Sequence, residues 1–500
     1  MNLIKESSKF EMRIFIALFK IHINLTKIMR YLYIPVFLLT MTLISCSGNQ
    51  KESEYTVIKG ASIFDGNGTE PIEKSEIVIR NGIIDCIGQA GSCSIPMGSE
   101  VIDGAGKFIT PGLIDAHMHF FQTGFFDGRP DAMDLNETYP FTEIAAYQEL
   151  NPQRYYDTYL CSGITGVYDV GGMSWSVALQ QTAEENPMAP HVAAAGPLLT
   201  PVPGAPFDLP SDRVLVQLDS EETAVKMVQY MSALGSTGIK FWMIRANDEE
   251  YMSRVAAAAK EIEKYGNQMI AHTTTLQQAK AAIRNGAKLL VHSVEDQEVD
   301  EEFIELAKEE GTIYNPTLIV GAGYLVAYRG AADIAPIPIN DPNGCVDQRT
   351  RELITTASQF KNHPRLTDGL RDRLEDFNPE TDMTTDLMLQ NLKAVYDAGI
   401  PIVVGTDAGN PGTLHGISIF DEMEMMQQAG IAAEDLIVMA TKNGAMAMRR
   451  LNDFGTLERG KFGNLIMMNA DPSEDITNMR TLTHVMIKGK LMKVGEVQKN

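Results

Sequence analysis

Apolar and polar positions alternate along short runs at both ends of the chain. Between residues 55 and 110 the runs YTVIKGASIFDG, SEIVIRNGIIDCIG and EVIDGAGKFITPG follow a period of two and are separated by glycine-containing turns. Near the C-terminus, FGNLIMMNAD and HVMIKGKLMKV repeat the pattern. Two strand-rich ends around a different middle predict one small β domain built from residues 55–110 and 454–500.

The middle of the chain alternates short apolar runs with helical segments. The runs are typical of buried parallel strands: GITGVYDV, HVAAAGP, STGIKFW, NQMIAH, AKLLVHS, GTIYNPTLIV and IPIVVGTD. Helical periodicity is clear in SEETAVKMVQYMSAL, TLQQAKAAIRN and DLMLQNLKAVYDAG. Serial βα repeats of this length predict an α/β fold, either a barrel or a doubly wound sheet. Residues 321–385 interrupt the repeats with Pro, Gly and polar positions, which indicates a long insertion.

The N-terminal residues indicate export. Residues 31–45, YLYIPVFLLTMTLIS, form an apolar run of the length of a signal-peptide core, and Arg30 precedes it. The run ends in the tetrapeptide LISC at Cys46, which resembles a bacterial lipobox, in which the cysteine is acylated. Because Met29 lies just before the apolar run, we expect translation to start there.

We therefore expect residues 1–45 to be a leader and lipoprotein signal peptide, and residues 46–54 to be a polar tether behind the acylated Cys46. The mature protein would be anchored by its lipid to a bacterial membrane, on the periplasmic side or at the cell surface. A plain signal peptide, or an uncleaved anchor with a chance cysteine, remains the alternative.

The composition excludes several functions. The chain has 500 residues, with 42 Lys and Arg against 65 Asp and Glu, so its net charge is −23. A nucleic-acid binder needs clustered basic residues, and no such run occurs. Five cysteines are too few for a disulfide scaffold. Cys86 and Cys93 lie in one predicted hairpin, and the sequence leaves open whether they form a disulfide or stay free.

The segment IDAHMH, residues 114–119, carries the first candidate chemistry. Residues i and i+2 of a strand point to the same side, so His117 and His119 would share one face. Two imidazoles so placed are suitable zinc ligands. The pair alone is weak evidence, but further candidates, Lys240, His272, His292 and Asp407, each end a separate apolar run. The carboxyl ends of parallel barrel strands are where active sites are assembled.

Taken together, these motifs resemble the amidohydrolase superfamily, and within it the imidazolonepropionase-like and prolidase-like branch. The resemblance rests on ITPGLIDAHMH (109–119), GITGVYDVGG (163–172), IKFW (239–242), AHTT (271–274), VHSVE (291–295), VGTDAG (404–409) and GTLERGKFGNLIMM (455–468). It implies a (β/α)8 TIM barrel over residues 111–453, with the insertion 321–385. It also implies that the two chain ends, 55–110 and 454–500, form a small β-sandwich.

The resemblance also implies a binuclear metal site. His117 and His119 would bind the more buried ion, and His272 and His292 the second. Lys240, carboxylated by CO2 to a carbamate, would bridge both ions, and Asp407 would complete the buried site. Two divalent ions can share a hydroxide as nucleophile. Zinc is the first candidate metal, and manganese and cobalt suit the same ligands.

Asp407 is the predicted catalytic residue. It would take a proton from the attacking water and deliver it to the leaving amine.

The chain departs from the family pattern at positions where substrate contacts are expected. Tyr168 is a candidate substrate contact, because it stands where the family usually has a basic residue before Asp-Val-Gly-Gly. Thr273-Thr274-Thr275 replaces a usual aromatic or histidine. Arg245 is a candidate partner for a substrate carboxylate, with a solvated surface arginine as the alternative. His415 is a candidate for a substrate contact or for support of a metal ligand.

We therefore expect a hydrolase of amide bonds in small molecules, with dipeptides and N-acyl amino acids favoured. Alternatives are a hydrolase of cyclic amides, lactones or phosphotriesters, and a non-catalytic surface-tethered binding protein. No nucleic-acid partner is expected, and the membrane is contacted only through the lipid anchor. Metal identity, substrate identity and a homo-oligomeric state stay open.

Overall fold

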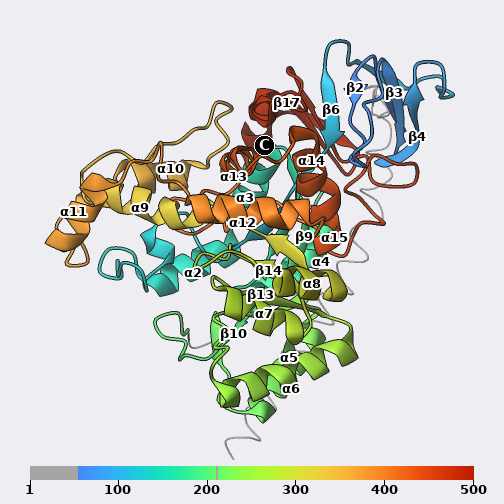
Figure 1. The fold of residues 1–500 in the computed structure, drawn as a ribbon. Helices are drawn as coiled ribbons and strands as arrows, with labels where there is room; N and C mark the ends of the chain where they lie inside the picture. The colour runs from blue at the N-terminus through green and yellow to red at the C-terminus, as the bar shows by residue number, and fades with distance from the viewer. Residues whose placement is uncertain (1–53, 210–211, 500) are drawn as a thin grey trace, which may run out of the picture. The chain divides into compact units, whose positions relative to one another are not determined.

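The fold is taken from a computed structural model that describes residues 54–209 and 212–499 (Figure 1). The predicted leader, Met29 as start and the lipidation site Cys46 lie outside these residues. Across the two described ranges, no helix has both the length and the apolar character needed to cross a membrane.

Parallel strands form the centre of the molecule. One set pairs in the order β7–β8–β9 and another in the order β12–β13–β14–β15. Their bounds are β7 Leu113–Met118, β8 Ile164–Asp169, β9 His191–Ala194, β12 Gly238–Phe241, β13 Gln268–His272, β14 Ala287–Val291 and β15 Ile313–Asn315. Nearly all of their residues are buried, as expected for strands covered on both faces.

Individual hydrogen bonds join the two sets into a ring. The Thr237 amide donates to the Ala194 carbonyl (2.9 Å), which connects β9 to β12. On the other side, segment 402–408 lies between β15 and β7 and makes parallel bridges to both, at Tyr314↔Ile402 and Met118↔Ala408. This segment takes the eighth strand position of the barrel wall, and we call each of these positions a stave. The prediction of a (β/α)8 barrel is therefore confirmed.

Helices cover the outside of the barrel (Figure 1). Their bounds are α2 Phe141–Leu150, α3 Gln153–Cys161, α4 Leu179–Glu185, α5 Glu221–Leu234, α6 Glu249–Tyr265, α7 Leu276–Arg284, α8 Glu301–Glu310, α12 Asp386–Asp397, α13 Ser418–Gln428, α14 Ala433–Val438 and α15 Gly444–Ala447. The three predicted helices are present as α5, α7 and α12. In α5 the local signals are complete: the Ser220 side chain caps the Thr223 amide, and Gly235 ends the helix at φ 91°.

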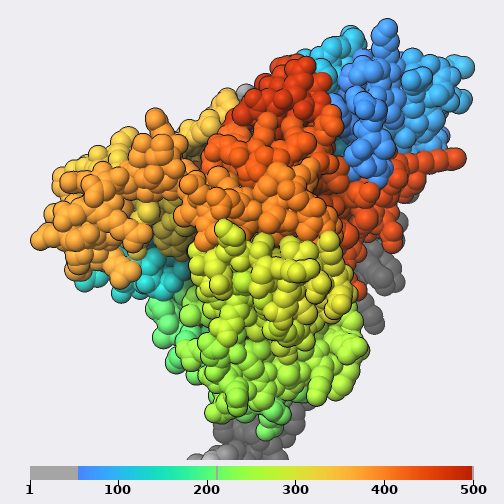
Figure 2. All heavy atoms as spheres, viewed as in Figure 1, coloured from blue at the N-terminus to red at the C-terminus, as the bar shows by residue number. Residues whose placement is uncertain are grey.

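The insertion is more regular than its sequence indicates. It contains α9 (Val320–Ala331), α10 (Gln348–Thr355) and α11 (Asp368–Asp376), which form the orange lobe of Figure 2. The predicted strand in GTIYNPTLIV is wrong at its end, because a turn with Thr317 at φ 44° stops β15 and Leu-Ile-Val runs into α9.

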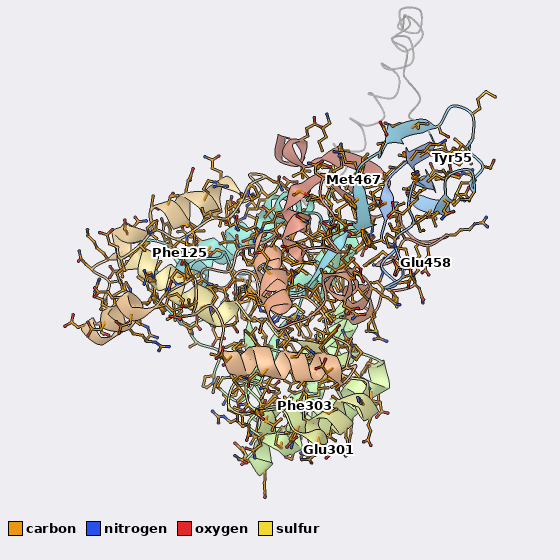
Figure 3. All side chains as sticks on the ribbon, turned by 45° about the horizontal axis from the view of Figure 1, so that its top comes forward. Tyr55, Phe125, Glu301, Phe303, Glu458 and Met467 are labelled. Atoms are coloured by element: carbon orange, nitrogen blue, oxygen red, sulfur yellow. A yellow bond between two sulfur atoms is a disulfide. The ribbon has the colours of Figure 1, made fainter. Side chains whose placement is uncertain are left out.

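The two chain ends form two sheets that share one apolar core. One sheet has the order β4–β3–β1–β5 and the other β18–β17–β16–β6–β2. Their bounds are β1 Tyr55–Lys59, β2 Ser62–Ile63, β3 Ser75–Arg80, β4 Ile83–Gln89, β5 Glu100–Asp103, β6 Phe108–Pro111, β16 Leu465–Met468, β17 Leu482–Ile487 and β18 Lys490–Lys493. Antiparallel pairing of β16 with β6 joins the C-terminal part to the N-terminal part, as the predicted sandwich requires. Figure 3 accordingly shows Tyr55 and Met467 in the same region, far from Phe303 of α8.

A short two-stranded extension lies beside the barrel. β10 (Leu198–Thr200) contacts β12 at the Leu199↔Phe241 pair, and β11 (Leu215–Gln217) pairs with β10. This extension supplies one wall of the pocket described below.

Two disulfides cross-link the described part of the chain. Cys86 pairs with Cys93 in the hairpin β3–β4, which settles the alternative that the sequence left open. Cys161 of α3 pairs with Cys345, which ties the insertion to a barrel helix. This second pair was not predicted, because its cysteines are separated by 184 positions.

The two disulfides should differ in their contribution to stability. In the chain-entropy description, the long loop closed by Cys161–Cys345 corresponds to about 5 kcal/mol of unfolding free energy and the short Cys86–Cys93 loop to about 2 kcal/mol. Cys161→Ala/Cys345→Ala should therefore lower the urea midpoint more than Cys86→Ala/Cys93→Ala, measured without reductant. An equal or smaller effect of the long-loop variant would contradict this ranking.

Candidate metal centre and pocket

The six predicted metal-site residues come together at the carboxyl end of the barrel. His117 lies near the end of β7 and His119 just after it, Lys240 lies in β12, and His272 ends β13. His292 follows β14, and Asp407 lies in the stave 402–408. Five of the six residues are buried and His272 is partly exposed, because the barrel strands and the loops above them enclose this end.

The Asp407 carboxylate is at the centre of the cluster. Its Oδ1 lies 2.9 Å from His119 Nε2 and 3.2 Å from His117 Nε2. Its Oδ2 lies 3.9 Å from His292 Nε2. The His272 ring is 4.3 Å from the His292 ring, centroid to centroid. One carboxylate thus faces imidazoles that come from separate strands.

The donor atoms suit a divalent cation. Each of His117, His292 and Asp407 offers one ligand atom, and these three atoms lie within 4.8 Å of one another. The close contacts of Asp407 Oδ1 with the two imidazoles do not have hydrogen-bond geometry, so within the described chain both ring nitrogens of His117 and Oδ1 of Asp407 lack a hydrogen-bond partner. Buried polar atoms of this kind are rare because losing water without a new partner is costly. Imidazole and carboxylate are ligands that zinc and its neighbours accept, so the residues fit a metal centre.

Neighbouring groups orient the ligands. His119 Nδ1 lies 2.5 Å from the Gly171 carbonyl, and His292 Nδ1 lies 2.7 Å from Thr317 Oγ1. These contacts hold the Nδ1 edge of each ring and leave Nε2 facing Asp407. Such outer contacts commonly fix the orientation of histidine ligands in metal sites.

Asp115 connects the first stave to the last. Its carboxylate accepts hydrogen bonds from the Thr406 amide (3.1 Å), from Thr406 Oγ1 (2.7 Å) and from the His117 amide (3.2 Å). The Asp407 amide in turn donates to the His117 carbonyl (2.7 Å), and Asp407 has the left-handed φ of 58°. A non-glycine residue held in this conformation is often part of a functional site.

Burial sets the protonation of most groups. It lowers the pKa of His117 to about 4 and that of His272 to about 3, which favours neutral, metal-binding imidazoles. Burial alone would also lower the pKa of His119, but contacts with Asp169 and Asp407 outweigh it and raise the value to about 9. Burial lowers the pKa of Lys240 to about 7, so a large share of its amine is neutral near pH 7.

A cavity of about 270 Å³ opens over the cluster. We call its apolar lining side chains the apolar wall, which includes Phe121, Leu198, Phe207 and Trp242. We call its polar lining side chains the polar wall, which includes Gln122, Arg129, Tyr324 and Asn410. The sequence analysis did not identify these polar residues: Asn410 lies only three positions after Asp407, but Arg129 lies in a loop with no recognisable motif.

The structure corrects two of the predicted substrate contacts. Tyr168 has no solvent exposure and does not line the cavity, because its side chain points into the barrel interior, where Gln268 Nε2 donates to its hydroxyl (2.9 Å). Arg245 is an exposed side chain beyond β12 and does not line the cavity either. Neither is in a position to contact a molecule held over the metal cluster.

His415 contacts the backbone of His119, one of the predicted metal ligands. It is buried, its Nε2 lies 3.0 Å from the His119 carbonyl, and its ring packs on Tyr155 at 4.1 Å between centroids. Of the two predicted roles, the geometry favours support of His119 over contact with substrate.

A comparison with protein families identifies the fold family of most of the chain. The model of the "Amidohydrolase family" matches residues 108–492. An imidazolonepropionase of Idiomarina loihiensis is 33% identical over 96 residues, which cover 19% of this chain and 22% of that protein. A dihydroorotase of Caldanaerobacter subterraneus is 42% identical over 98 residues, which cover 19% and 22%. The chain thus matches about a fifth of the length of these curated relatives.

Solved structures resemble the whole described fold. A Xaa-Pro dipeptidase with bound methionine matches with a TM-score of 0.63 and 23% identity, over 88% of this chain and 100% of that one. A molinate hydrolase matches with a TM-score of 0.67 and 20% identity, over 90% and 97%. At these identities the likeness establishes the fold.

If His117 binds a metal ion, replacing it should lower the metal content of the protein. His117→Ala should reduce the metal content of the purified protein and lower its melting temperature, because the ion would lose a buried nitrogen ligand. The control is His363→Ala, at a partly exposed histidine of the insertion whose Nε2 contacts the Asp134 carbonyl (2.8 Å). Metal content is measured by inductively coupled plasma mass spectrometry. Unchanged metal in His117→Ala would contradict the assignment.

Proposed function

Because the chain belongs to the amidohydrolase family, we propose that it is a metal-dependent hydrolase that cleaves amide bonds in small molecules. The observation that carries the proposal is the buried cluster of His117, His292 and Asp407, whose donor atoms lie within 4.8 Å at the carboxyl end of the barrel. That end is where the barrel fold assembles catalytic groups. The cavity above it has room for a small substrate.

The proposed site holds two divalent ions, with zinc as the first candidate. The residues that would bind them are His117, His119, Lys240, His272, His292 and Asp407. Lys240 would act as a carbamate formed with CO2, and its burial and its pKa of about 7 favour that reaction, since only the neutral amine attacks CO2. When bound, the ions would supply Lewis-acid activation of a water molecule and of the scissile carbonyl.

Asp407 is the proposed general base and acid. Burial alone would raise its pKa, but His117 and His119 hold the pKa well below its usual range, so the carboxylate starts deprotonated. Asp407 takes one proton from the attacking water as the new C–O bond forms. It then returns that proton to the amide nitrogen as the C–N bond breaks, which releases a carboxylic acid and an amine.

The apolar wall of the cavity contributes in a different way. Phe121, Phe207 and Trp242 cover the space over the metal cluster and limit the water that surrounds a bound substrate. With less water, the charges of the site act more strongly on the reacting bond.

Dipeptides and N-acyl amino acids are the proposed substrates. The choice follows from two solved structures that share the fold, a Xaa-Pro dipeptidase (23% identity) and a prolidase complexed with N-methylphosphonate-L-proline (20% identity). A small-molecule substrate also agrees with the cavity volume of about 270 Å³.

We further propose that the protein is exported and held on a membrane by a lipid on Cys46. Two disulfides account for four of the five cysteines, and disulfides persist mainly outside the cytoplasm. The fifth cysteine is Cys46, within the lipobox-like LISC. Release of the protein from membranes by a Cys46→Ala substitution would support this proposal.

Replacement of the proposed base tests the mechanism. Asp407→Asn should lower kcat for a cleaved dipeptide by a factor of about 10³, because an amide cannot accept the proton. Asp397→Asn, at an exposed carboxylate of α12 paired with Lys393, should leave kcat unchanged. Near-normal turnover in a metal-replete Asp407→Asn protein would exclude the proposed role.

Replacement of Lys240 tests the carbamate. Lys240→Ala should lose metal and activity, and short carboxylic acids such as propionate should restore part of both by taking the place of the carbamate oxygens. Native mass spectrometry of the unsubstituted protein should show an added CO2 that Lys240→Ala lacks. Full activity of Lys240→Ala without added carboxylate would show that no carbamate is needed.

A further inference from the structure

The polar wall of the pocket contains an arginine that the mechanism does not use. Arg129 follows a short 3-10 helix, Phe126–Gly128, and its side chain is only 15% exposed. Its guanidinium lies 5.4 Å from the ring centroid of Tyr324 and 5.9 Å from that of Phe207. A buried cation with aromatic rings around it, in the wall of an active-site cavity, is a candidate for recognising an anionic group of the substrate.

The hydrogen bonds of Arg129 leave donors available. Nε and Nη2 donate to the two oxygens of Asp131 at 2.8 Å and 2.6 Å, and Nη1 donates to Asn410 Oδ1. A guanidinium carries five N–H groups, and the described residues engage no others. Asp131 therefore orients the guanidinium along one edge, and the remaining N–H groups can meet a ligand in the cavity.

Gln122 provides an independent sign of a polar ligand. The residue is 4% exposed and lines the same cavity. Its Oε1 has no hydrogen-bond partner among the described residues. An amide oxygen buried without a partner is costly, and a donor group of a bound molecule, such as an amide or amine N–H, would satisfy it.

Asn410 connects Arg129 to the catalytic residue. Its Oδ1 accepts from Arg129 and from the Tyr324 hydroxyl (2.7 Å), and its Nδ2 donates to the Asp407 carbonyl (3.0 Å). One side chain thus fixes the guanidinium relative to the backbone of the residue that would protonate the leaving nitrogen.

We propose that Arg129 binds the free carboxylate on the amine side of the substrate and that Gln122 accepts a hydrogen bond from a substrate N–H. The substrates are then N-acyl amino acids or dipeptides whose amine-side residue has an apolar side chain, which the wall of Phe121, Phe207 and Trp242 would cover. This inference rests on the proposed hydrolase function and narrows its substrate class.

Binding of a ligand that cannot be hydrolysed tests the inference separately from catalysis. The probes are 3-phenylpropanoate and 3-phenylpropan-1-ol, which share the apolar group and differ in the carboxylate. Titration calorimetry on the metal-loaded full chain should show tighter binding of the acid. Arg129→Gln should weaken binding of the acid by a factor of about 10 or more and change binding of the alcohol little.

Two further variants separate recognition from a structural role. Asp131→Asn should bind the acid more tightly, because it removes a negative charge beside the bound carboxylate while an amide oxygen can still accept from the guanidinium and keep it oriented; a merely structural Arg129 predicts equal or weaker binding. Arg245→Gln is the matched control, at an exposed arginine outside the cavity lining, and should bind both probes as the unsubstituted protein does.

The inference is overturned if Arg129→Gln binds the acid as tightly as the unsubstituted protein. It is also overturned if Arg129→Gln loses both probes equally while Asp131→Asn binds the acid no more tightly.

Hydrolysis provides the second readout. The ratio of kcat/KM for N-acetyl-L-phenylalanyl-L-leucine over its C-terminal amide should fall by a factor of about 10 or more in Arg129→Gln. Absence of all hydrolysis together with the expected binding pattern would reject the hydrolase function and leave the carboxylate site intact.

Discussion

The site depends on one junction, between the first stave of the barrel and the last. Asp115 of β7 accepts two hydrogen bonds from Thr406 and one from the His117 amide, and the Asp407 amide donates to the His117 carbonyl. The junction closes the barrel and at the same time brings the Asp407 carboxylate to within 3.2 Å of His117 Nε2. Because Asp115 is fully buried, losing its partners would leave a carboxyl group with neither water nor hydrogen bonds. The fold and the candidate chemistry therefore share the same interactions.

Burial then determines what the assembled groups can do. The imidazoles of His117 and His272 are kept neutral, and the Lys240 amine loses much of its preference for the proton, because the surrounding barrel stabilises charge poorly. The His117 ring nitrogens remain without partners among the described residues. Burying a carboxylate beside neutral imidazoles away from water costs free energy. A cation bound between these groups would offset that cost.

Much of this arrangement could be predicted from the sequence, where local pattern and chemistry agree. His117 and His119 share a strand face, and Lys240, His272, His292 and Asp407 each end a barrel stave, so the parallel topology alone brings them together. Features that depend on contacts between distant segments could not be predicted from local sequence pattern. The Cys161–Cys345 bond joins distant segments, and Arg129 reaches the pocket from a loop whose path depends on tertiary packing. Tyr168 was misassigned because the side-chain direction at that position of β8 leads into the barrel interior and not into the cavity.

The central claim is that these side chains hold metal ions for hydrolysis. The most direct measurement is a crystal structure of the protein, grown with zinc and bicarbonate, with anomalous diffraction recorded at the zinc edge. The account predicts two anomalous peaks, one contacted by His117, His119 and Asp407 and the other by His272 and His292, with carbamate density on Lys240 between them. Absence of anomalous signal at this cluster, with Lys240 unmodified, would contradict the account.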